Sequence, residues 1–185
     1  SRDWTHASEI ARKLEAAGQG SFGGRVAHYL CEQAAGAIGA GELDAARELL
    51  QQAIDAAPDA ARPRIDLARM QAQAGRHGEA LQTLLDLASV APQAMPLIAA
   101  AMAQSAGAAG QVARALQALQ ASYAEFASLD VLDAIVALES AQAGTPDAAR
   151  QRYLHHLERE QSLVATARWL AGEKLAHEEF HPQVQ

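Results

Sequence analysis

The sequence is poor in several residue types, and each shortage excludes a class of protein. One cysteine among 185 residues, Cys31, permits neither an intrachain disulfide nor a cysteine-based zinc site, so we expect a reducing compartment. Only 17 residues are Val, Ile or Thr, which argues against an all-β or α/β fold. The 15 basic and 22 acidic residues give a net charge of −7, which argues against binding nucleic acid. No apolar run approaches the roughly 20 residues of a membrane helix, so we expect a soluble polypeptide without direct membrane contact.

Alanine, by contrast, is abundant, with 46 residues, and leucine follows with 21. Both residue types favour helix. Gly and Pro separate the helix-favouring stretches and set their limits. The sequence therefore predicts ten helices, at residues 3–17, 25–39, 42–57, 61–74, 76–91, 95–107, 110–124, 129–143, 146–160 and 162–180.

An internal period of 34 residues organises these helices. Four residues recur at that distance: Gly41 as Gly75, Ala46 as Ala80, Leu50 as Leu84 and Pro58 as Pro92. A second register repeats Gly110, Ala115 and Leu119 as Gly144, Ala149 and Tyr153. We place the one extra residue between the two registers near 107–110. Gly suits a tight turn between antiparallel helices, Ala a close helix crossing, and Pro the end of the second helix.

This pattern resembles the tetratricopeptide repeat. The predicted fold is therefore an all-α tetratricopeptide-repeat solenoid of helix-turn-helix units, a right-handed superhelix of about ten helices. We expect one solenoid over 1–185, made of the second helix of a truncated repeat (3–24), repeats at 27–60 and 61–94, a degenerate repeat at 95–128, a repeat at 129–161 and an unpaired terminal helix (162–185). The unpaired helices at both ends predict that the chain is a piece of a longer protein.

A more specific resemblance covers nearly the whole chain and is strongest from 25 to 69. Residues 25–34 read R-V-A-H-Y-L-C-E-Q-A and residues 41–46 read G-E-L-D-A-A. They resemble the lipopolysaccharide assembly protein B (LapB) family, which has an I/V-A-H-F/Y-x-C-E-x-A segment followed by D/E-L-D-x-A. Arg62, Ile65 and Arg69 fall in the family's A-R-x-x-I-x-x-G-R stretch, with Ala68 in place of the glycine.

This resemblance implies an inner-membrane regulator of lipopolysaccharide biosynthesis in a Gram-negative bacterium, with its repeats on the cytoplasmic side. Members of the family act as adaptors that help the membrane protease FtsH degrade the deacetylase LpxC. The implied partners are thus FtsH, LpxC and other lipopolysaccharide-assembly proteins, and a homodimer is a further possibility. The family's membrane helix and its rubredoxin-like ribbon, with iron or zinc, are expected outside these residues, so we expect no cofactor within them.

In a solenoid of helix pairs, the first helix of each pair lines a concave groove. The predicted partner-binding residues in this groove are His28, Arg62, Ile65, Arg69, Gln73 and Gln104. The guanidinium groups of Arg62 and Arg69, two helical turns apart, could together hold a carboxylate or an acidic peptide. Further along, Leu97, Ala100, Val131, Ala134 and Leu138 are expected to make the groove apolar. The alternative is that the arginines are ordinary solvated residues and that the apolar residues pack on neighbouring helices.

One motif suggests an enzyme instead. His177-Glu178-Glu179-Phe180-His181 matches the H-E-x-x-H spacing of zinc peptidases. Pro182 follows at once and no third ligand lies downstream, so we expect an exposed helix end, no catalytic residues and no metal site. His28 and Cys31 share one helix face without a further partner, and we expect them to be partly buried helix residues. The function that we expect is a non-enzymatic adaptor; the alternative is a generic repeat module of another assembly.

Overall fold

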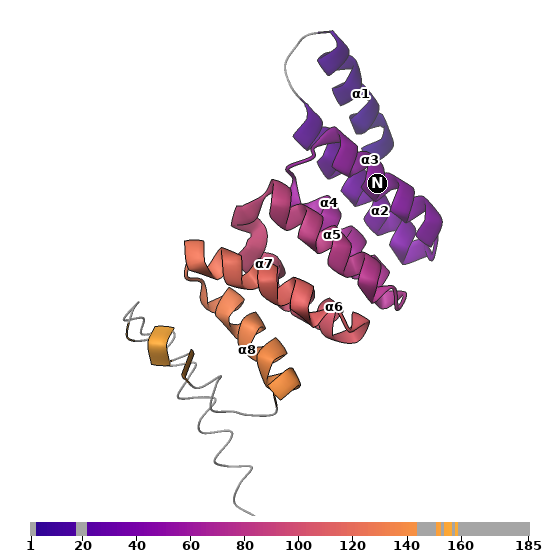
Figure 1. Cartoon of the computed structure of the whole chain (residues 1–185). Helices are drawn as coiled ribbons and strands as arrows, with labels where there is room; N and C mark the ends of the chain where they lie inside the picture. The colour runs from indigo at the N-terminus through magenta and orange to yellow at the C-terminus, as the bar shows by residue number, and fades with distance from the viewer. Residues whose placement is uncertain (1–2, 18–21, 144–150, 153, 157, 159–185) are drawn as a thin grey trace, which may run out of the picture.

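The fold is helical throughout the part of the chain that the computed structural model describes, namely residues 3–17, 22–143, 151, 152, 154–156 and 158 (Figure 1). The elements are α1 (Trp4–Ala16), α2 (Gly23–Ala40), α3 (Leu43–Ala56), α4 (Ala61–Gln73), α5 (His77–Val90), η1 (Pro92–Ala94), α6 (Met95–Ala109), α7 (Val112–Glu125) and α8 (Leu129–Ala143). Each of these α-helices agrees with its predicted range to within two residues. Most of the predicted helix at 146–160 and all of that at 162–180 lie outside the described residues.

Three helix pairs, α2–α3, α4–α5 and α6–α7, are closed by the predicted glycine turns. Gly41, Gly75 and Gly110 have φ of 80°, 74° and 66°, a conformation that a residue with Cβ rarely adopts. In each turn the glycine N–H donates to the carbonyl three residues back, and the next N–H donates to the carbonyl five residues back. These bonds satisfy the last carbonyls of the first helix and send the chain back antiparallel.

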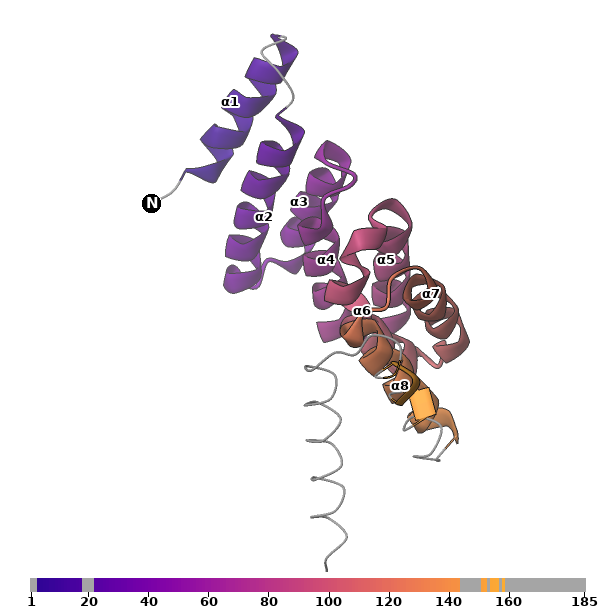
Figure 2. The ribbon, with the colours of Figure 1, turned by 90° about the vertical axis from the view of Figure 1, so that its left-hand side faces the viewer.

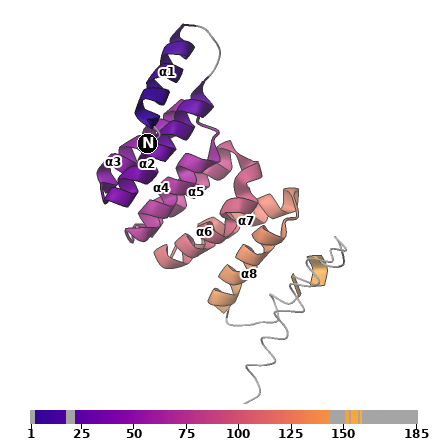
Figure 3. The same ribbon diagram turned by 180° about the vertical axis from the view of Figure 1, so that it is seen from behind.

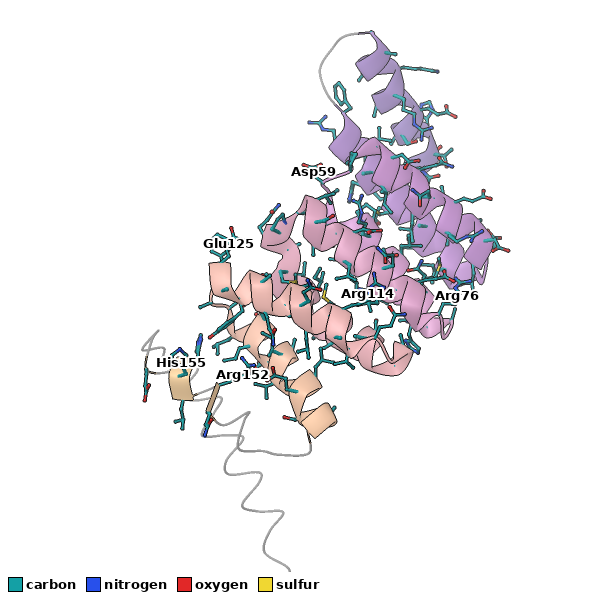
Figure 4. The ribbon with its side chains drawn as sticks, in the orientation of Figure 1. Asp59, Arg76, Arg114, Glu125, Arg152 and His155 are labelled. Carbon is teal, nitrogen blue, oxygen red and sulfur yellow. The ribbon has the colours of Figure 1, made fainter. Side chains whose placement is uncertain are left out.

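At the other end of each pair, proline follows the second helix as predicted. Pro58 comes two residues after the end of α3, and Pro92 two residues after the end of α5. Figure 4 shows Asp59 and Glu125, from the connections between pairs, on one edge of the molecule, and Arg76, from a glycine turn, on the opposite edge. The turns within pairs and the connections between pairs thus occupy separate edges.

The core depends on alanine where helices cross. Ala46, Ala80 and Ala115 are each 0% exposed, as the repeat pattern predicts. A larger side chain at these points would push the paired axes beyond the 8–10 Å that close helix packing requires. The first turn of α2 also runs close to the end of α3, because a Cβ on Gly23 would lie 2.3 Å from the carbonyl oxygen of Ala56.

The helices form two rows. Figure 2 shows α3, α5 and α7 along one side of the array and α2, α4, α6 and α8 along the other, and Figure 3 shows α4, α6 and α8 side by side from behind. At the N-terminal end, α1 packs on α2, where Trp4 stacks on Tyr29 with ring centroids 5.7 Å apart. None of the described helices is both long and apolar enough to span a bilayer.

Helical residues beyond α8 dock on the same array. Arg152 donates two hydrogen bonds to Glu139 of α8, at 2.5 and 2.6 Å. His156 is 2% exposed and its Nδ1 lies 2.5 Å from the Tyr123 hydroxyl on α7. These contacts attach the segment around 151–158 to the third pair and to α8.

The extra residue does not lie near 107–110, and that prediction is wrong. The buried residues of α4 recur in α6 at a distance of 35, pairing Pro63, Leu67, Ala68, Met70 and Gln71 with Ile98, Met102, Ala103, Ser105 and Ala106. Ala57 and Ala91, just before, still lie 34 apart. The extra residue therefore lies between Ala91 and Ile98, where η1 and the first turn of α6 absorb it.

Candidate functional site: a groove along α2, α4, α6 and α8

Three hollows follow one another along this row of helices. One of about 470 Å³ lies between α2 and α4, one of about 510 Å³ between α4 and α6, and one of about 490 Å³ between α6 and α8. Arg69 and Gln73 line both the first and the second hollow, and Gln104 lines both the second and the third. The hollows therefore form one continuous groove. We call them the polar end (α2/α4), the central hollow (α4/α6) and the alanine end (α6/α8).

The polar end carries a network of four charged side chains. Arg62 Nη2 lies 2.8 Å from Glu32 and Arg62 Nε 3.5 Å from Asp66, while Arg69 Nη1 donates to Asp66 at 3.0 Å. Asp66 thus lies between the two arginines that were predicted to share a carboxylate. The structure brings Arg62 and Arg69 to one surface, but each already has a carboxylate partner from the chain itself.

The sixth predicted residue, His28, takes part in this network from its margin. Its Nδ1 lies 3.2 Å from Arg62 Nη1, and its ring packs edge-on to Trp4 with centroids 5.9 Å apart. The hydrogen bond to Glu32 raises the pKa of Arg62, so this guanidinium stays charged. His28 lies beside the polar end, and the other five predicted residues line the groove itself.

Cys31 forms part of the wall of the polar end. It is 2% exposed, and burial raises the pKa of its thiol. Arg62 opposes this effect, whereas Asp66 and Glu32 add to it. A thiol with a raised pKa is a poor nucleophile at neutral pH, so Cys31 acts here as a small packing residue.

The central hollow combines an apolar floor with a polar rim. Ile65, Leu84 and Ile98 contribute to the floor, and Leu97 is 72% exposed beside it. The rim carries Arg69, Gln73, His77, Gln104 and Ser105. Exposure of a large apolar side chain next to polar groups is the usual composition of a surface that binds a protein segment.

The alanine end is lined mostly by small residues of α6 and α8. They are Ala100, Ala103, Gly107, Ala134, Ala137 and Ala141, together with Gln104 and Leu138. The charged residues of its lining are Asp130 and Asp133, which the sequence analysis did not place in the groove.

The groove face of α8 differs by one residue from the predicted one. Val131 was expected in the groove but is 0% exposed and belongs to the core. The prediction extended the shifted register of α6 into α8, but the extra residue gained before α6 is lost again between α7 and α8. Counting 68 positions, two full periods, from Arg62 and Ile65 gives Asp130 and Asp133. That count identifies both residues from the sequence.

Other predicted features fall elsewhere. The H-E-x-x-H segment at 177–181 lies outside the described residues. Within the part of the chain that is described, no cluster of three or more His, Cys, Asp or Glu side chains could hold a metal ion.

Comparison with known proteins supports the repeat architecture. Residues 37–105 match a family model described as tetratricopeptide repeat, and they include α3, α4, α5 and most of α6. A crystal structure of MamA protein superposes with a TM-score of 0.54 at 13% identity, covering 86% of this chain and 98% of that one. TTC0263, a thermophilic TPR protein of Thermus thermophilus, gives a TM-score of 0.52 at 17% identity, covering 91% and 89%. No curated protein matches. The predicted all-α tetratricopeptide-type solenoid is thereby confirmed.

Proposed function

We propose that this chain is the protein-binding repeat module of a non-enzymatic adaptor that regulates lipopolysaccharide biosynthesis. The observation that carries the proposal is the continuous groove, which passes through three hollows on α2, α4, α6 and α8. Tetratricopeptide-type arrays expose long surfaces of this kind, on which a protein segment can lie. Groove residues such as Arg69 and Leu97 are largely exposed, so they are available to a partner.

The lipopolysaccharide assignment comes from the resemblance to the LapB family, and the polar end is where that resemblance is concentrated. Its two most similar stretches, around 25–34 and 62–69, lie on α2 and α4. The ion pair between Glu32 and Arg62 joins these stretches directly. The polar end is therefore the part of the groove that we assign to a partner specific to this family.

In this proposal the repeats bring LpxC within reach of the protease FtsH at the cytoplasmic face of the inner membrane. The groove holds a segment of one partner, and degradation follows because the two proteins are kept close together. No chemical step is assigned to any residue of the chain. A groove formed by solvent-exposed side chains suits binding and release better than catalysis in an enclosed site.

Binding between purified proteins tests the proposal. We expect the chain to bind purified LpxC or the cytoplasmic part of FtsH, and the double substitution Arg62→Glu, Arg69→Glu to weaken that binding at least tenfold. Arg114→Glu is the matched control, because Arg114 bonds Gln82 and Gln111 on α5 and before α7, away from the groove. Circular dichroism verifies that helicity is unchanged.

The result also separates this function from a generic repeat module. If neither LpxC nor FtsH binds, and if deleting these repeats leaves LpxC turnover in cells unchanged, the lipopolysaccharide assignment is wrong. The alanine end, which lies on the part of the chain where the LapB resemblance weakens, would then serve a partner in another assembly.

A further inference from the structure

The groove carries opposite charge at its two ends, and this gives a bound segment a direction. At the polar end the outermost charges are positive, because the side chains of Arg69 and Arg62 are 63% and 46% exposed whereas that of Asp66 is 21% exposed. At the alanine end the charged lining residues are Asp130 and Asp133. A segment that lies along the groove therefore meets guanidinium groups at one end and carboxylates at the other.

Partners within the chain do not remove this capacity. A guanidinium has five N–H donors, and the bond between Arg69 Nη1 and Asp66 uses one of them. An ionised carboxylate accepts about four hydrogen bonds, so Asp130 and Asp133 can accept from a ligand in addition to groups of the chain. Both ends can thus form further charge-assisted hydrogen bonds.

The floor between the ends favours a helix over an extended segment. Ile65, Leu97 and Ile98 make the central hollow apolar, and alanines floor the far end. The backbone N–H and C=O groups of α4, α6 and α8 are bonded within those helices, so they offer few partners to the backbone of an extended ligand. A ligand helix satisfies its own backbone groups and presents only side chains, and alanine lets it approach closely.

We propose that the groove binds an amphipathic α-helix of a partner protein, with its acidic N-terminal turn at the polar end and its basic C-terminal turn at the alanine end. This inference rests on the proposed protein-binding function and deepens it. Crossing α4, α6 and α8 at about 8–10 Å per helix requires roughly 20 Å, or about 13 helical residues. Acidic residues in the first turn and basic residues in the last turn also stabilise a helix through its own dipole.

Designed peptides test the direction of binding. The probe is a fluorescently labelled peptide of about 14 residues, with Glu in its first turn, Leu along one face and Lys in its last turn. The matched control has the same composition with the Glu and Lys turns exchanged. A third peptide carries two central prolines, which prevent helix formation. Fluorescence anisotropy at low and high salt gives the three affinities.

We expect the first peptide to bind about tenfold more tightly than the charge-exchanged peptide at low salt. The difference should shrink at high salt, because screening weakens exposed charge pairs. The proline peptide should bind at least tenfold more weakly than the first. Equal affinity for the two charge arrangements would overturn the direction, and tight binding of the proline peptide would overturn the helical ligand in favour of an extended one.

Two variants of the protein provide the reciprocal test. Reversing both ends, with Arg69→Glu and Asp133→Lys, should invert the preference so that the charge-exchanged peptide binds more tightly. The neutral pair Arg69→Gln and Asp133→Asn should abolish the preference while keeping measurable binding, and it keeps the test decisive if the reversed variant does not fold. A preference that survives in the neutral pair would contradict the inference.

Failure here differs from failure of the proposed function. If LpxC or FtsH binds and depends on Arg62 and Arg69, but the peptides show no direction, only the helical ligand is wrong. If the peptides bind with the expected direction and neither protein binds, the groove is a helix receptor for a partner outside lipopolysaccharide synthesis.

Discussion

The two ends of the groove are similar in size and opposite in construction. The polar end, of about 470 Å³, is bounded by charged side chains, and the ion pair from Arg62 to Glu32 joins α4 to α2 across two repeats. The alanine end, of about 490 Å³, is bounded by small side chains and by the buried Leu138. Equivalent positions, 68 residues apart, thus hold Arg69 in one and Ala137 in the other. Groove positions can diverge in this way because the fold depends on other positions.

Those other positions are the helix crossings and the turns. Ala46, Ala80 and Ala115 are buried to the same extent in all three pairs, and the three turn glycines share one conformation. Stability in such arrays comes from each unit and its nearest neighbours. The comparison therefore predicts that substitutions at the two ends differ in kind: at the alanine end they act on burial, and at the polar end they act on exposed charge.

The largest effect is expected for Leu138→Ala at the alanine end. Leu138 is 4% exposed and packs in the core, so its truncation should lower the free energy of unfolding by about 2–4 kcal/mol. Leu97→Ala is the control, because Leu97 is 72% exposed and should change stability by less than about 0.5 kcal/mol. Urea titrations followed by circular dichroism measure both. Equal losses would show that burial does not distinguish the two leucines.

A second prediction concerns ligand binding. Ala137→Trp, at an exposed position of α8, should fill the alanine end and weaken the designed acidic-to-basic peptide by about tenfold, or about 1.4 kcal/mol, without loss of stability. Arg69→Ala should weaken it by about threefold, because one exposed charge contributes less than about 1 kcal/mol. Anisotropy titrations measure both affinities. A larger loss for Arg69→Ala would make the polar end the dominant contact.

The third prediction uses the buried thiol of the polar end. Burial raises the folded-state pKa of Cys31 above the value of about 8.5 in an unfolded chain. Above that pH the unfolded state releases the proton first, so stability should fall as pH rises, by at most about 1.4 kcal/mol per pH unit. Cys31→Ala lacks this contribution and shows the remaining slope due to tyrosine and lysine. Urea titrations between pH 7.5 and 10 compare them, and parallel curves would disprove the effect.

The smallest effect is expected for Arg62→Met at the polar end. This side chain is 46% exposed, so loss of its pairs with Glu32 and Asp66 should lower stability by only about 0.5 kcal/mol, and by less in high salt. The methionine keeps most of the apolar stem in place. A loss above about 2 kcal/mol would mean that the network holds α2 and α4 together, and the contrast between the two ends would disappear.

The sequence predicted the fold well because the repeat is encoded by local chemistry. Gly41 and Gly75 mark turns that need positive φ, and Pro58 and Pro92 mark helix ends, so each boundary depends on one residue and its immediate neighbours. The groove residues on α4 followed from the same count. Residues whose role is set by such short-range rules can be identified without coordinates.

Two features of the groove could not be obtained in the same way. The pairing of Arg62 and Arg69 with Glu32 and Asp66 depends on rotamers and on the spacing between α2 and α4, which a helical wheel does not contain. The groove face of α8 depends on two one-residue shifts that cancel. The first shift lies in a connection where a 3-10 turn hides it, so a count that carried the shift forward assigned Val131 to the surface and overlooked Asp130.

The cancelling shifts make the segment 95–128 a removable cassette. It enters one residue out of phase and leaves in phase again, so excising it would place the residues of α8 behind α5 in the same angular position that α6 now reaches by way of η1. An array with such a cassette can shorten or lengthen between generations without rotating the units that follow. The irregular pair is thus the place where this solenoid is best able to change its length and, with it, the length of the segment that it can hold.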